Sequence, residues 1–467
     1  EKSKMAGRFF LGALVGALGA LAYARLHRRR RRSPGSMPSE STIRLMTRLA
    51  LKHNAINLSQ GFPNESPPAD MVLSAAGALL DGESAESAAR MAERLRPMLE
   101  QRGGKDALNQ YSIPAGLPAL REQISRHYAH YMPTVPADPE QNVTVVLGAT
   151  EGFAVLLRAL CNPGDSVVFF EPFHELYPSQ CMLWGMRPRA VTLRECEFGE
   201  WSYELPELLR ALRGARLLLL NSPHNPTGKV FDAVELAEIA RACIDHDVLC
   251  VTDEIYQFIT YPDATGRLHK HVSIATVDEQ MRERTCIVNA LSKSASATGW
   301  RIGWVVSPAH LTPAVRACHD QLVVQAPTPL QFGATALLSL GPSFFDSIAA
   351  EYLTKRDLLV AALRAARFTV IAPPPGAYYL FVAYADVPAL RGLAPREAAM
   401  AMIERHGVAC VPGDNFYLGR SKLDPQNGGR YLRFAFVRSI DVLRTAAQRL
   451  HAMAAAEPCL VMEGGLS

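Results

Sequence analysis

The sequence predicts an α/β fold, with a mainly parallel sheet between helices and a smaller α+β domain after it. Between about residues 115 and 310, short apolar runs alternate with helical patterns, and nearly continuous apolar runs are typical of strands buried on both faces. After residue 329 this alternation ends, and a long helical stretch precedes shorter strands. A chain of 467 residues has room for about two to three domains.

Six apolar runs are the predicted strands of the first region, at residues 143–147, 166–170, 216–220, 248–252, 285–291 and 301–306. Helical patterns separate them, at residues 151–160, 233–246 and 312–322. Strands that alternate with helices form a parallel sheet, and ligands of such a sheet bind beyond the carboxyl ends of its strands. The later region predicts one helical stretch at 330–366 and strands near 378–382 and 431–436.

These patterns divide the chain into four predicted parts. Residues 1–36 are a hydrophobic and basic N-terminal segment. Residues 37–110 form an N-terminal arm and part of the small domain, with a polar, alanine-rich helical insertion near 82–105. Residues 111–328 form the large domain, and residues 329–467 form the C-terminal small domain.

The N-terminal segment carries an apolar run at residues 9–24 and then Arg25 and Arg28 to Arg32. A short hydrophobic helix with a basic flank predicts a membrane anchor that holds a soluble catalytic body on the cytoplasmic side. The alternative is a processed leader for an organelle such as a mitochondrion or plastid.

Charge and cysteine content exclude two classes of function. Nine of the 49 basic side chains lie in residues 1–36, so the rest of the chain is mildly acidic, which is not typical of a nucleic-acid-binding protein. The nine cysteines form no C-x-x-C pair, and no His/Cys cluster has the spacing of metal ligands. We therefore expect no metal site.

Two predicted strands end in residues that suit ligand binding. The first runs into Gly148-Ala149-Thr150, and a turn of small residues at a helix N-terminus can bind a phosphate group. Another ends in NSPHNPTG, where prolines constrain the backbone around Asn225. Taken alone, both segments are also compatible with ordinary turns.

Two further strands end in ionisable residues. Asp253 follows the strand at 248–252, and a carboxylate there needs a cation or a hydrogen bond unless it only caps a helix. Lys293 follows the strand at 285–291. Most lysines lie on the surface, but one beside a buried strand has a lowered pKa and an amine available for imine chemistry.

The motifs NSPHNPTG, VTDEIY and SKSASATGWRIGW, in this order, resemble the class I/II aminotransferases of fold type I, which depend on pyridoxal 5′-phosphate (PLP). The resemblance covers about residues 40–455 and implies a seven-stranded, mainly parallel sheet in the large PLP-binding domain. The motifs QGFP, NQY, EPF-x-x-x-Y and SATGW are most similar to the kynurenine, glutamine-phenylpyruvate and methionine aminotransferase branch.

The resemblance implies the catalytic roles. Lys293 would form the internal aldimine and move the proton between the substrate Cα and the cofactor. Asp253 would pair with the pyridinium nitrogen, and Asn225 and Tyr256 would hydrogen-bond the phenolic oxygen of the cofactor.

The same resemblance implies a phosphate site and a dimer. Ser292 and Arg301 would bind the phosphate, with Ala149 and Thr150 adding backbone and hydroxyl contacts. Tyr111 would reach the phosphate of a partner subunit, so we expect a homodimer with shared active sites.

The substrate site follows by the same comparison of motifs. Arg433 would grip the α-carboxylate, the backbone of Gly61 would approach it, and Asn225 would also contact the substrate. His174 falls where the family usually has an aromatic residue stacked on the pyridine ring, and the alternative register places Phe173 there.

The implied activity moves an amino group from an L-amino acid to a 2-oxo acid. No arginine stands out as a partner for a side-chain carboxylate, which favours neutral, aromatic or sulfur-containing amino acids. The alternatives are a PLP-dependent carbon–sulfur β-lyase acting on cysteine S-conjugates, or a lyase similar to aminocyclopropane-carboxylate synthase. A non-enzymatic regulator is disfavoured because no helix-turn-helix is visible and Lys293 is present.

Overall fold

A computed structural model describes residues 68–80, 83–101, 109–262 and 266–455. The chain divides into two units, Glu1–Ser39 and Glu40–Ser467, and every described residue belongs to the second. Two predicted features, the apolar run at 9–24 and Gly61, lie outside the described residues.

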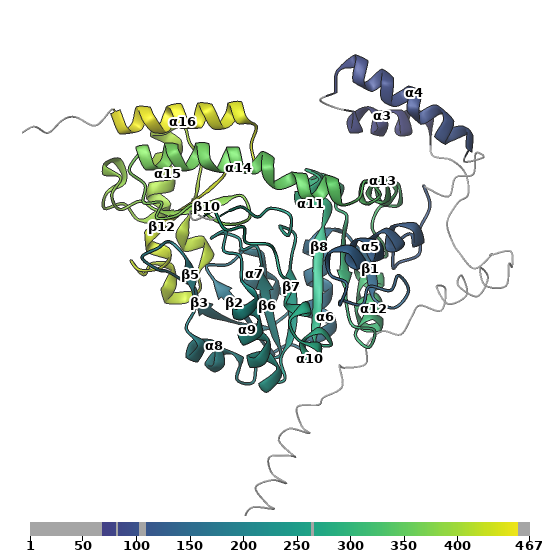
Figure 1. Cartoon of the computed structure of the whole chain (residues 1–467), viewed down its shortest axis with the longest axis horizontal. Coiled ribbons are helices and arrows are strands. Elements are labelled where there is room, and N and C mark those ends of the chain that lie inside the picture. The colour runs from purple at the N-terminus through teal and green to yellow at the C-terminus, as the bar shows by residue number, and fades with distance from the viewer. Residues whose placement is uncertain (1–67, 81–82, 102–108, 263–265, 456–467) are drawn as a thin grey trace, which may run out of the picture. The chain divides into compact units, whose positions relative to one another are not determined.

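A seven-stranded sheet forms the centre of the described chain (Figure 1). Its order is β1-β9-β8-β7-β6-β2-β3, and every pairing is parallel except those of β9 with β1 and β8. The strands are β1 (Val143–Val146), β2 (Ser166–Glu171), β3 (Arg187–Thr192), β6 (Leu217–Asn221), β7 (Leu249–Asp253), β8 (Thr285–Ala290) and β9 (Gly303–Val306). The predicted α/β class and mainly parallel sheet are therefore confirmed.

Strand β3 was missed by the sequence analysis. It lies at the edge of the sheet, and its sequence RPRAVT buries only its last two residues. An edge strand needs no continuous apolar run, so it gives a weaker pattern than the central strands, which are fully buried.

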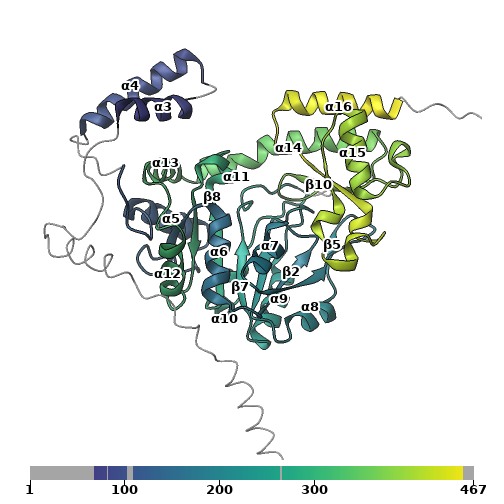
Figure 2. The same ribbon diagram turned by 180° about the vertical axis from the view of Figure 1, so that it is seen from behind.

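Helices cover both faces of this sheet (Figures 1 and 2). They are α5 (Pro118–Tyr131), α6 (Gly148–Leu160), α7 (Leu176–Leu183), α8 (Leu205–Leu212), α9 (Ala233–Asp245), α10 (Glu279–Arg282) and α12 (Thr312–Leu322). Helices α8 and α9 pack their apolar residues against Phe170 and Leu218, whose side chains share one face of the sheet. A short two-stranded sheet pairs β4 (Arg194–Glu195) with β5 (Trp201–Ser202).

The predicted helical stretch at 330–366 is two helices. They are α13 (Thr328–Leu338) and α14 (Pro342–Ala365), and Gly341 between them has a positive φ of 77°. That backbone conformation favours glycine, and the following Pro342 starts a new helix because its fixed φ suits the first helical turn.

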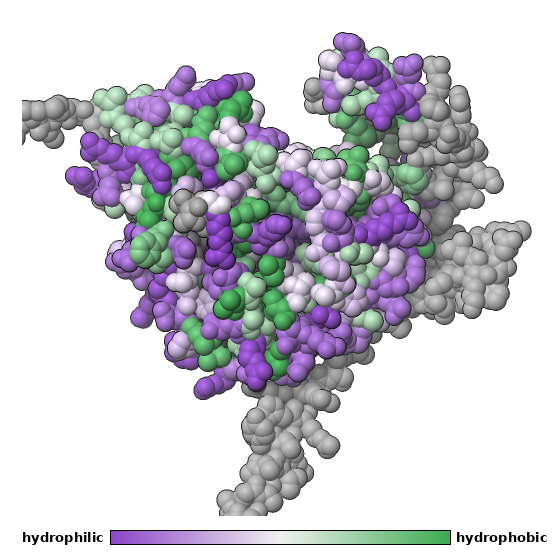
Figure 3. Space-filling view, viewed as in Figure 1, coloured by the Kyte–Doolittle hydropathy of each residue, from purple (hydrophilic) through white to green (hydrophobic). Residues whose placement is uncertain are grey.

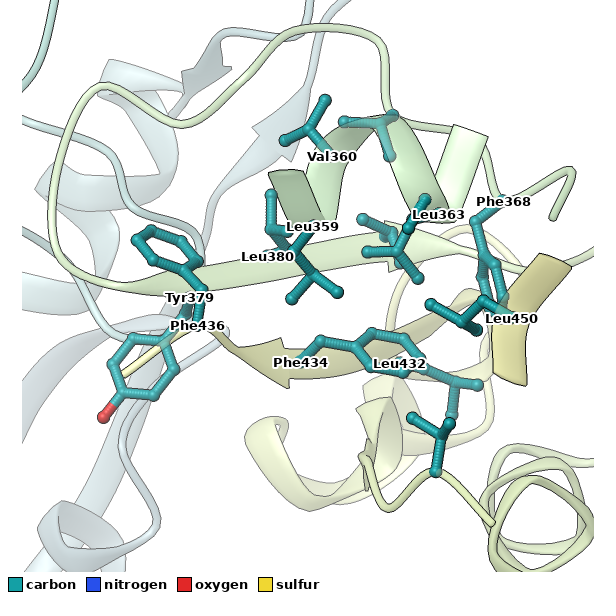
Figure 4. Close-up of a cluster of buried hydrophobic side chains, with 14 of the residues drawn as sticks. Leu359, Val360, Leu363, Phe368, Tyr379, Leu380, Leu432, Phe434, Phe436 and Leu450 are labelled. Carbon is teal, nitrogen blue, oxygen red and sulfur yellow. The ribbon is translucent and has the colours of Figure 1, made fainter. Parts of the chain in front are cut away.

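A three-stranded antiparallel sheet follows, ordered β10 (Tyr379–Ala383), β12 (Tyr431–Ala435) and β11 (Val411–Pro412). Helices α14, α15 (Pro395–His406) and α16 (Ile440–Ala455) accompany it. Figure 4 shows Leu363 of α14, Leu380 of β10 and Leu432 of β12 in one hydrophobic cluster. The strands near 378–382 and 431–436 are confirmed within one residue at each end.

Two helices precede α5 in the chain, α3 (Ala69–Leu79) and α4 (Ala85–Gln101). Helix α4 corresponds to the predicted helical insertion near 82–105. No residue of α3 is buried, and Met71 and Leu73 are among its exposed apolar residues. Figure 3 shows hydrophobic and hydrophilic residues side by side on this pair of helices. The domain boundaries at 36, 110 and 328 stay predictions.

The predicted membrane-anchored or organellar location is wrong. Within the described ranges, no helix is long and apolar enough to cross a lipid bilayer. The anchor was predicted at residues 9–24, which lie outside those ranges.

Candidate active site

A pocket lies at the carboxyl ends of the central strands and collects most of the predicted site residues. The predicted residues that line it are Ala149, Thr150, His174, Asn225, Asp253, Tyr256, Ser292, Lys293 and Arg301. They come from segments that end β1, β2, β6, β7 and β8 or that lead into β9. The ends of neighbouring strands therefore bring together residues that are more than 150 positions apart.

Asp253 is held at the end of β7 by its neighbours on both sides. The side chain of Asn221, on the adjacent strand β6, donates to the backbone carbonyl of Asp253 at 3.0 Å. The hydroxyl of Tyr177 donates to Asp253 Oδ2 at 2.6 Å, and the backbone N–H of Ile255 donates to Oδ1 at 3.4 Å. Burial raises the pKa of Asp253 to about 6, although the Tyr177 hydrogen bond and Lys293 oppose the rise. Such a carboxylate can stabilise a cation that binds next to it.

Lys293 lies on the short helix α11 (Leu291–Ser294), directly after the buried strand β8. Burial lowers the pKa of Lys293, and the nearby Asp253 opposes this while Arg301 and Arg433 add to it. Its Nζ is 5.8 Å from the centre of the Tyr378 ring. The amine of Lys293 is therefore uncharged and nucleophilic in a larger fraction of molecules than the amine of an exposed lysine.

A candidate anion site lies where Gly148 begins α6. Gly148 has a φ of +71°, and a Cβ atom at this position would be 2.3 Å from Arg301 Nη2. A side chain at position 148 would be strained at this φ and would have to displace the guanidinium of Arg301 from the amino end of the helix. Arg301 Nη1 also donates to the carbonyl of Thr298 at 2.9 Å. With Thr150 and Ser292 on the same pocket wall, this arrangement can hold a phosphate group.

Arg433 reaches the site from β12 of the small sheet. Its Nη1 donates to Asn225 Oδ1 at 2.8 Å, and the backbone N–H of Asn225 donates to Asn221 Oδ1 at 2.7 Å. The Arg433 guanidinium lies between two rings, 4.5 Å from the centre of Tyr379 and 4.8 Å from that of Phe416. Its Nε is buried and has no hydrogen-bond partner within the described chain, so it can still bind a carboxylate.

The remaining predicted residues differ in position. His174 lines the pocket, whereas Phe173 is buried against Phe169, with ring centres 5.2 Å apart. Burial lowers the pKa of His174 to about 4, so its ring is neutral at physiological pH. Tyr111 is 54% exposed and is not among the residues that line the described pocket of its own chain.

Two tyrosines that were not predicted as site residues support the site. Tyr177 is the last residue of the EPF-x-x-x-Y motif, which carries part of the resemblance. Tyr379 begins β10, and its hydroxyl lies 2.9 Å from that of Tyr256. Each is far in sequence from the residue that it contacts, so neither contact follows from a local pattern.

The arrangement fits PLP. It combines a lysine amine of lowered pKa, a buried carboxylate and an anion site with an arginine whose Nε is unpaired among the described residues. In the described part of the chain, no three metal-ligating side chains are grouped.

Comparisons with known proteins agree with this fit. Residues 69–450 match the family model of the class I and II aminotransferases. Human kynurenine–oxoglutarate transaminase 1 is 30% identical over 427 residues, covering 86% of this chain and 93% of the relative. Methionine aminotransferase of Escherichia coli (strain K12) is 30% identical over 405 residues, covering 87% and 94%.

Solved structures show the same similarity. N-succinyldiaminopimelate aminotransferase from Mycobacterium tuberculosis superposes with a TM-score of 0.69 at 29% identity, covering 91% of this chain and 99% of that chain. A mutant aspartate aminotransferase from Thermus thermophilus gives a TM-score of 0.66 at 27% identity, covering 78% and 92%. The chain therefore belongs to the class I and II aminotransferases, and it is a PLP-dependent enzyme of fold type I that transfers amino groups.

Proposed function

We propose that this aminotransferase acts on L-amino acids with neutral, aromatic or sulfur-containing side chains, passes the amino group to a 2-oxo acid, and holds its cofactor through Lys293. The observation that carries the proposal is the presence of Lys293 and Asp253 in one pocket, where burial lowers the pKa of the amine and raises that of the carboxyl group. Perturbed pKa values of this kind are concentrated at catalytic sites.

When bound, PLP supplies an electron sink that makes the hydrogen on the substrate Cα acidic. Lys293 would hold the cofactor, and its amine would take the proton from the substrate Cα and return it. Asp253 keeps a proton on the ring nitrogen, and Asn225 and Tyr256 orient the phenolic oxygen. Arg433 would bind the substrate carboxylate.

The rest of the pocket wall would hold the cofactor in place. Arg301, Ser292, Thr150 and the backbone at Ala149 bind the phosphate at the amino end of α6. His174 would contact the ring of the cofactor, and its position among the residues that line the pocket favours it over the buried Phe173.

The proposed substrate class rests on the charges of the pocket. Among the described residues that line it in one copy of the chain, Arg301 is the only arginine, and it belongs to the phosphate site. Arg433 is next to Asn225 and is assigned to the α-carboxylate. A second carboxylate on the substrate side chain would therefore be desolvated without a partner, which costs free energy.

The assignment of Lys293 is tested with Lys293→Ala and the exposed control Lys422→Ala. We expect Lys293→Ala to lose transamination and to lose the absorption band of covalently bound cofactor, while Lys422→Ala keeps both. Borohydride reduction followed by mass spectrometry should locate the cofactor on Lys293. Cofactor bound covalently to Lys293→Ala would refute the assignment.

The substrate class is tested with a panel of amino donors and one 2-oxo acid acceptor. We expect higher kcat/KM for methionine, phenylalanine and kynurenine than for aspartate. The alternative activity, carbon–sulfur β-elimination, is measured on a cysteine S-conjugate. Release of pyruvate and ammonia that exceeds transamination with every donor would reassign the enzyme as a lyase.

We further propose a homodimer in which Tyr111 reaches the phosphate site of the partner subunit. Its exposure supports this role, as does the fact that it is not among the residues that line the pocket of its own chain. Co-expression of Lys293→Ala with Tyr111→Ala tests it. If Tyr111 acts across the interface, each mixed dimer contains one intact site, and activity returns. If Tyr111 acts within its own subunit, both sites stay defective.

A further inference from the structure

Tyr379 joins the two sheets at the active site. It is the first residue of β10 in the three-stranded sheet, whereas Tyr256 follows β7 of the seven-stranded sheet. The two hydroxyl oxygens are 2.9 Å apart, and both side chains are buried. Figure 4 shows Tyr379 at the opposite end of the hydrophobic cluster from Phe368 and Leu450.

Tyr379 also contacts the arginine assigned to the substrate carboxylate. The guanidinium of Arg433 lies 4.5 Å from the centre of the Tyr379 ring, and its Nη1 donates to Asn225. A cation over an aromatic ring is attracted by the negative face of the ring, and this attraction is stronger at a buried site. Tyr379 therefore touches both Tyr256, by its hydroxyl, and Arg433, by its ring.

The number of protons decides the direction of the hydrogen bond between the two tyrosines. Each hydroxyl has one proton to donate and can also accept. Burial raises the pKa of Tyr256 well above its usual value, and Tyr378, Tyr379 and Asp253 add to this, so Tyr256 keeps its proton. If Tyr256 donates that proton to the cofactor, Tyr379 must be the donor in the bond between them.

We propose that Tyr379 is a positioning residue that directs the hydroxyl proton of Tyr256 toward the cofactor and seats the guanidinium of Arg433. This inference rests on the proposed function, since it takes the phenolic oxygen of PLP as the acceptor of Tyr256. A hydrogen bond received from Tyr379 polarises the Tyr256 hydroxyl and strengthens it as a donor. The hydroxyl and the ring of Tyr379 have separate tasks, so different substitutions separate them.

Tyr379→Phe removes the hydroxyl and keeps the ring. The holoenzyme is titrated with pH while the absorption band of the bound cofactor is recorded. Weaker donation by Tyr256 favours the protonated form of the chromophore, so we expect the midpoint to rise by about half a pH unit. Tyr256→Phe should raise it further in the same direction.

Tyr379→Leu removes the ring as well. Without the ring, Arg433 loses one of the two aromatic groups that hold its guanidinium. We expect KM for the amino acid to rise by about two- to thirtyfold, which is the size of a cation–π contact. Tyr379→Phe should change KM much less than Tyr379→Leu, because the phenyl ring remains.

Tyr431→Phe is the matched control. Its hydroxyl also bonds between sheets, since it donates from β12 of the three-stranded sheet to Glu195 of β4 in the two-stranded sheet at 3.1 Å, and its side chain is also buried. We expect this variant to titrate like the wild type. Thermal unfolding of each variant shows whether it is folded under the conditions of the titration.

The measurements distinguish failure of the proposed role of Tyr379 from failure of the proposed function. A wild-type midpoint in Tyr379→Phe, or the same rise in Tyr431→Phe, would overturn the role of Tyr379 and leave the proposed function intact. Absence of any Lys293-dependent absorption band in the wild-type holoenzyme would overturn the proposed function, and the role of Tyr379 with it.

Discussion

Two adjacent carboxylates at the end of β7 show how differently the two sides of one strand are built. Asp253 lines the pocket, and its oxygens accept one hydroxyl and one backbone hydrogen bond. Glu254 is fully buried and accepts from Ser273 at 2.6 Å and Thr252 at 3.1 Å, and it pairs with His271 at 3.0 Å. The protein surrounds Glu254 with partners and leaves Asp253 with fewer.

The difference indicates which carboxylate has a structural role and which one has a chemical role. A buried charge is costly unless the protein pairs it, so the partners of Glu254 are typical of a group that stabilises the fold. Asp253 keeps a raised pKa, which means that its charge still costs free energy. A bound cation can recover that free energy, and the ring nitrogen of PLP is such a cation when it is protonated.

The largest effect is expected from replacing Glu254, the carboxylate with the structural role. Glu254→Ala leaves His271, Ser273 and Thr252 without their common acceptor and opens a cavity. We expect the free energy of unfolding to fall by about 3–5 kcal/mol, measured by chemical denaturation. Glu254→Gln is the control, because its amide oxygen can still accept from the two hydroxyls and should recover part of the loss. Equal stability of Glu254→Ala and the wild type would contradict the structural role.

The next largest effect is expected from replacing Asp253, the carboxylate that lines the pocket. Asp253→Asn removes the charge and keeps the shape, so we expect kcat to fall by about 10²–10³-fold, the usual cost of losing a preorganised electrostatic partner. The cofactor-free form should become more stable by up to about 3 kcal/mol, because the costly buried charge is gone. Opposite signs for activity and stability would distinguish Asp253 from Glu254. A variant with wild-type turnover would remove Asp253 from the site chemistry.

The sequence predicted the parts of the site that follow buried strands. Asn225, Asp253 and Lys293 each come shortly after an apolar run, and the carboxyl ends of neighbouring strands meet at one edge of the sheet. The resemblance added roles for Arg433 and Tyr256, which the pattern of apolar residues alone does not provide.

The sequence could not provide contacts between distant segments. Tyr177 comes from α7 and contacts a residue 76 positions away, and Tyr379 contacts one 123 positions away. Such pairs are set by how the helices and the small sheet pack on the central sheet. The break in the stretch at 330–366 does follow from a local pattern, because Gly341-Pro342 is a pair that commonly ends one helix and starts another, and the prediction of one continuous stretch is wrong at this point.

The pH dependence of the free energy of unfolding tests the raised pKa of Asp253 with the same variant, Asp253→Asn. Because the folded-state pKa of Asp253 is about 6, against 3.8 for the unbiased group, the folded cofactor-free protein binds more protons than the unfolded chain between these values. The free energy of unfolding should therefore fall as pH rises through this window, by up to about 3 kcal/mol from Asp253. The difference between the wild type and Asp253→Asn, measured at each pH, isolates this contribution. A difference that stays constant from pH 4 to 7 would argue against the raised pKa.

The smallest effect tests the one strong partner that Asp253 does have. The hydroxyl of Tyr177 donates to Asp253 Oδ2 at 2.6 Å and lowers the pKa of that carboxyl group against the effect of burial. Tyr177→Phe should raise the pKa of Asp253 further, so the acid limb of the kcat profile should move to higher pH by about one unit, equivalent to about 1.4 kcal/mol. Tyr203→Phe removes a similar hydrogen bond, to Glu238 at 2.8 Å, outside the residues that line the pocket. It should leave the profile in place, because neither Tyr203 nor Glu238 lines the pocket. An equal movement of the acid limb in both variants would contradict a specific effect of Tyr177 on the pKa of Asp253. Burial alone would then account for that pKa.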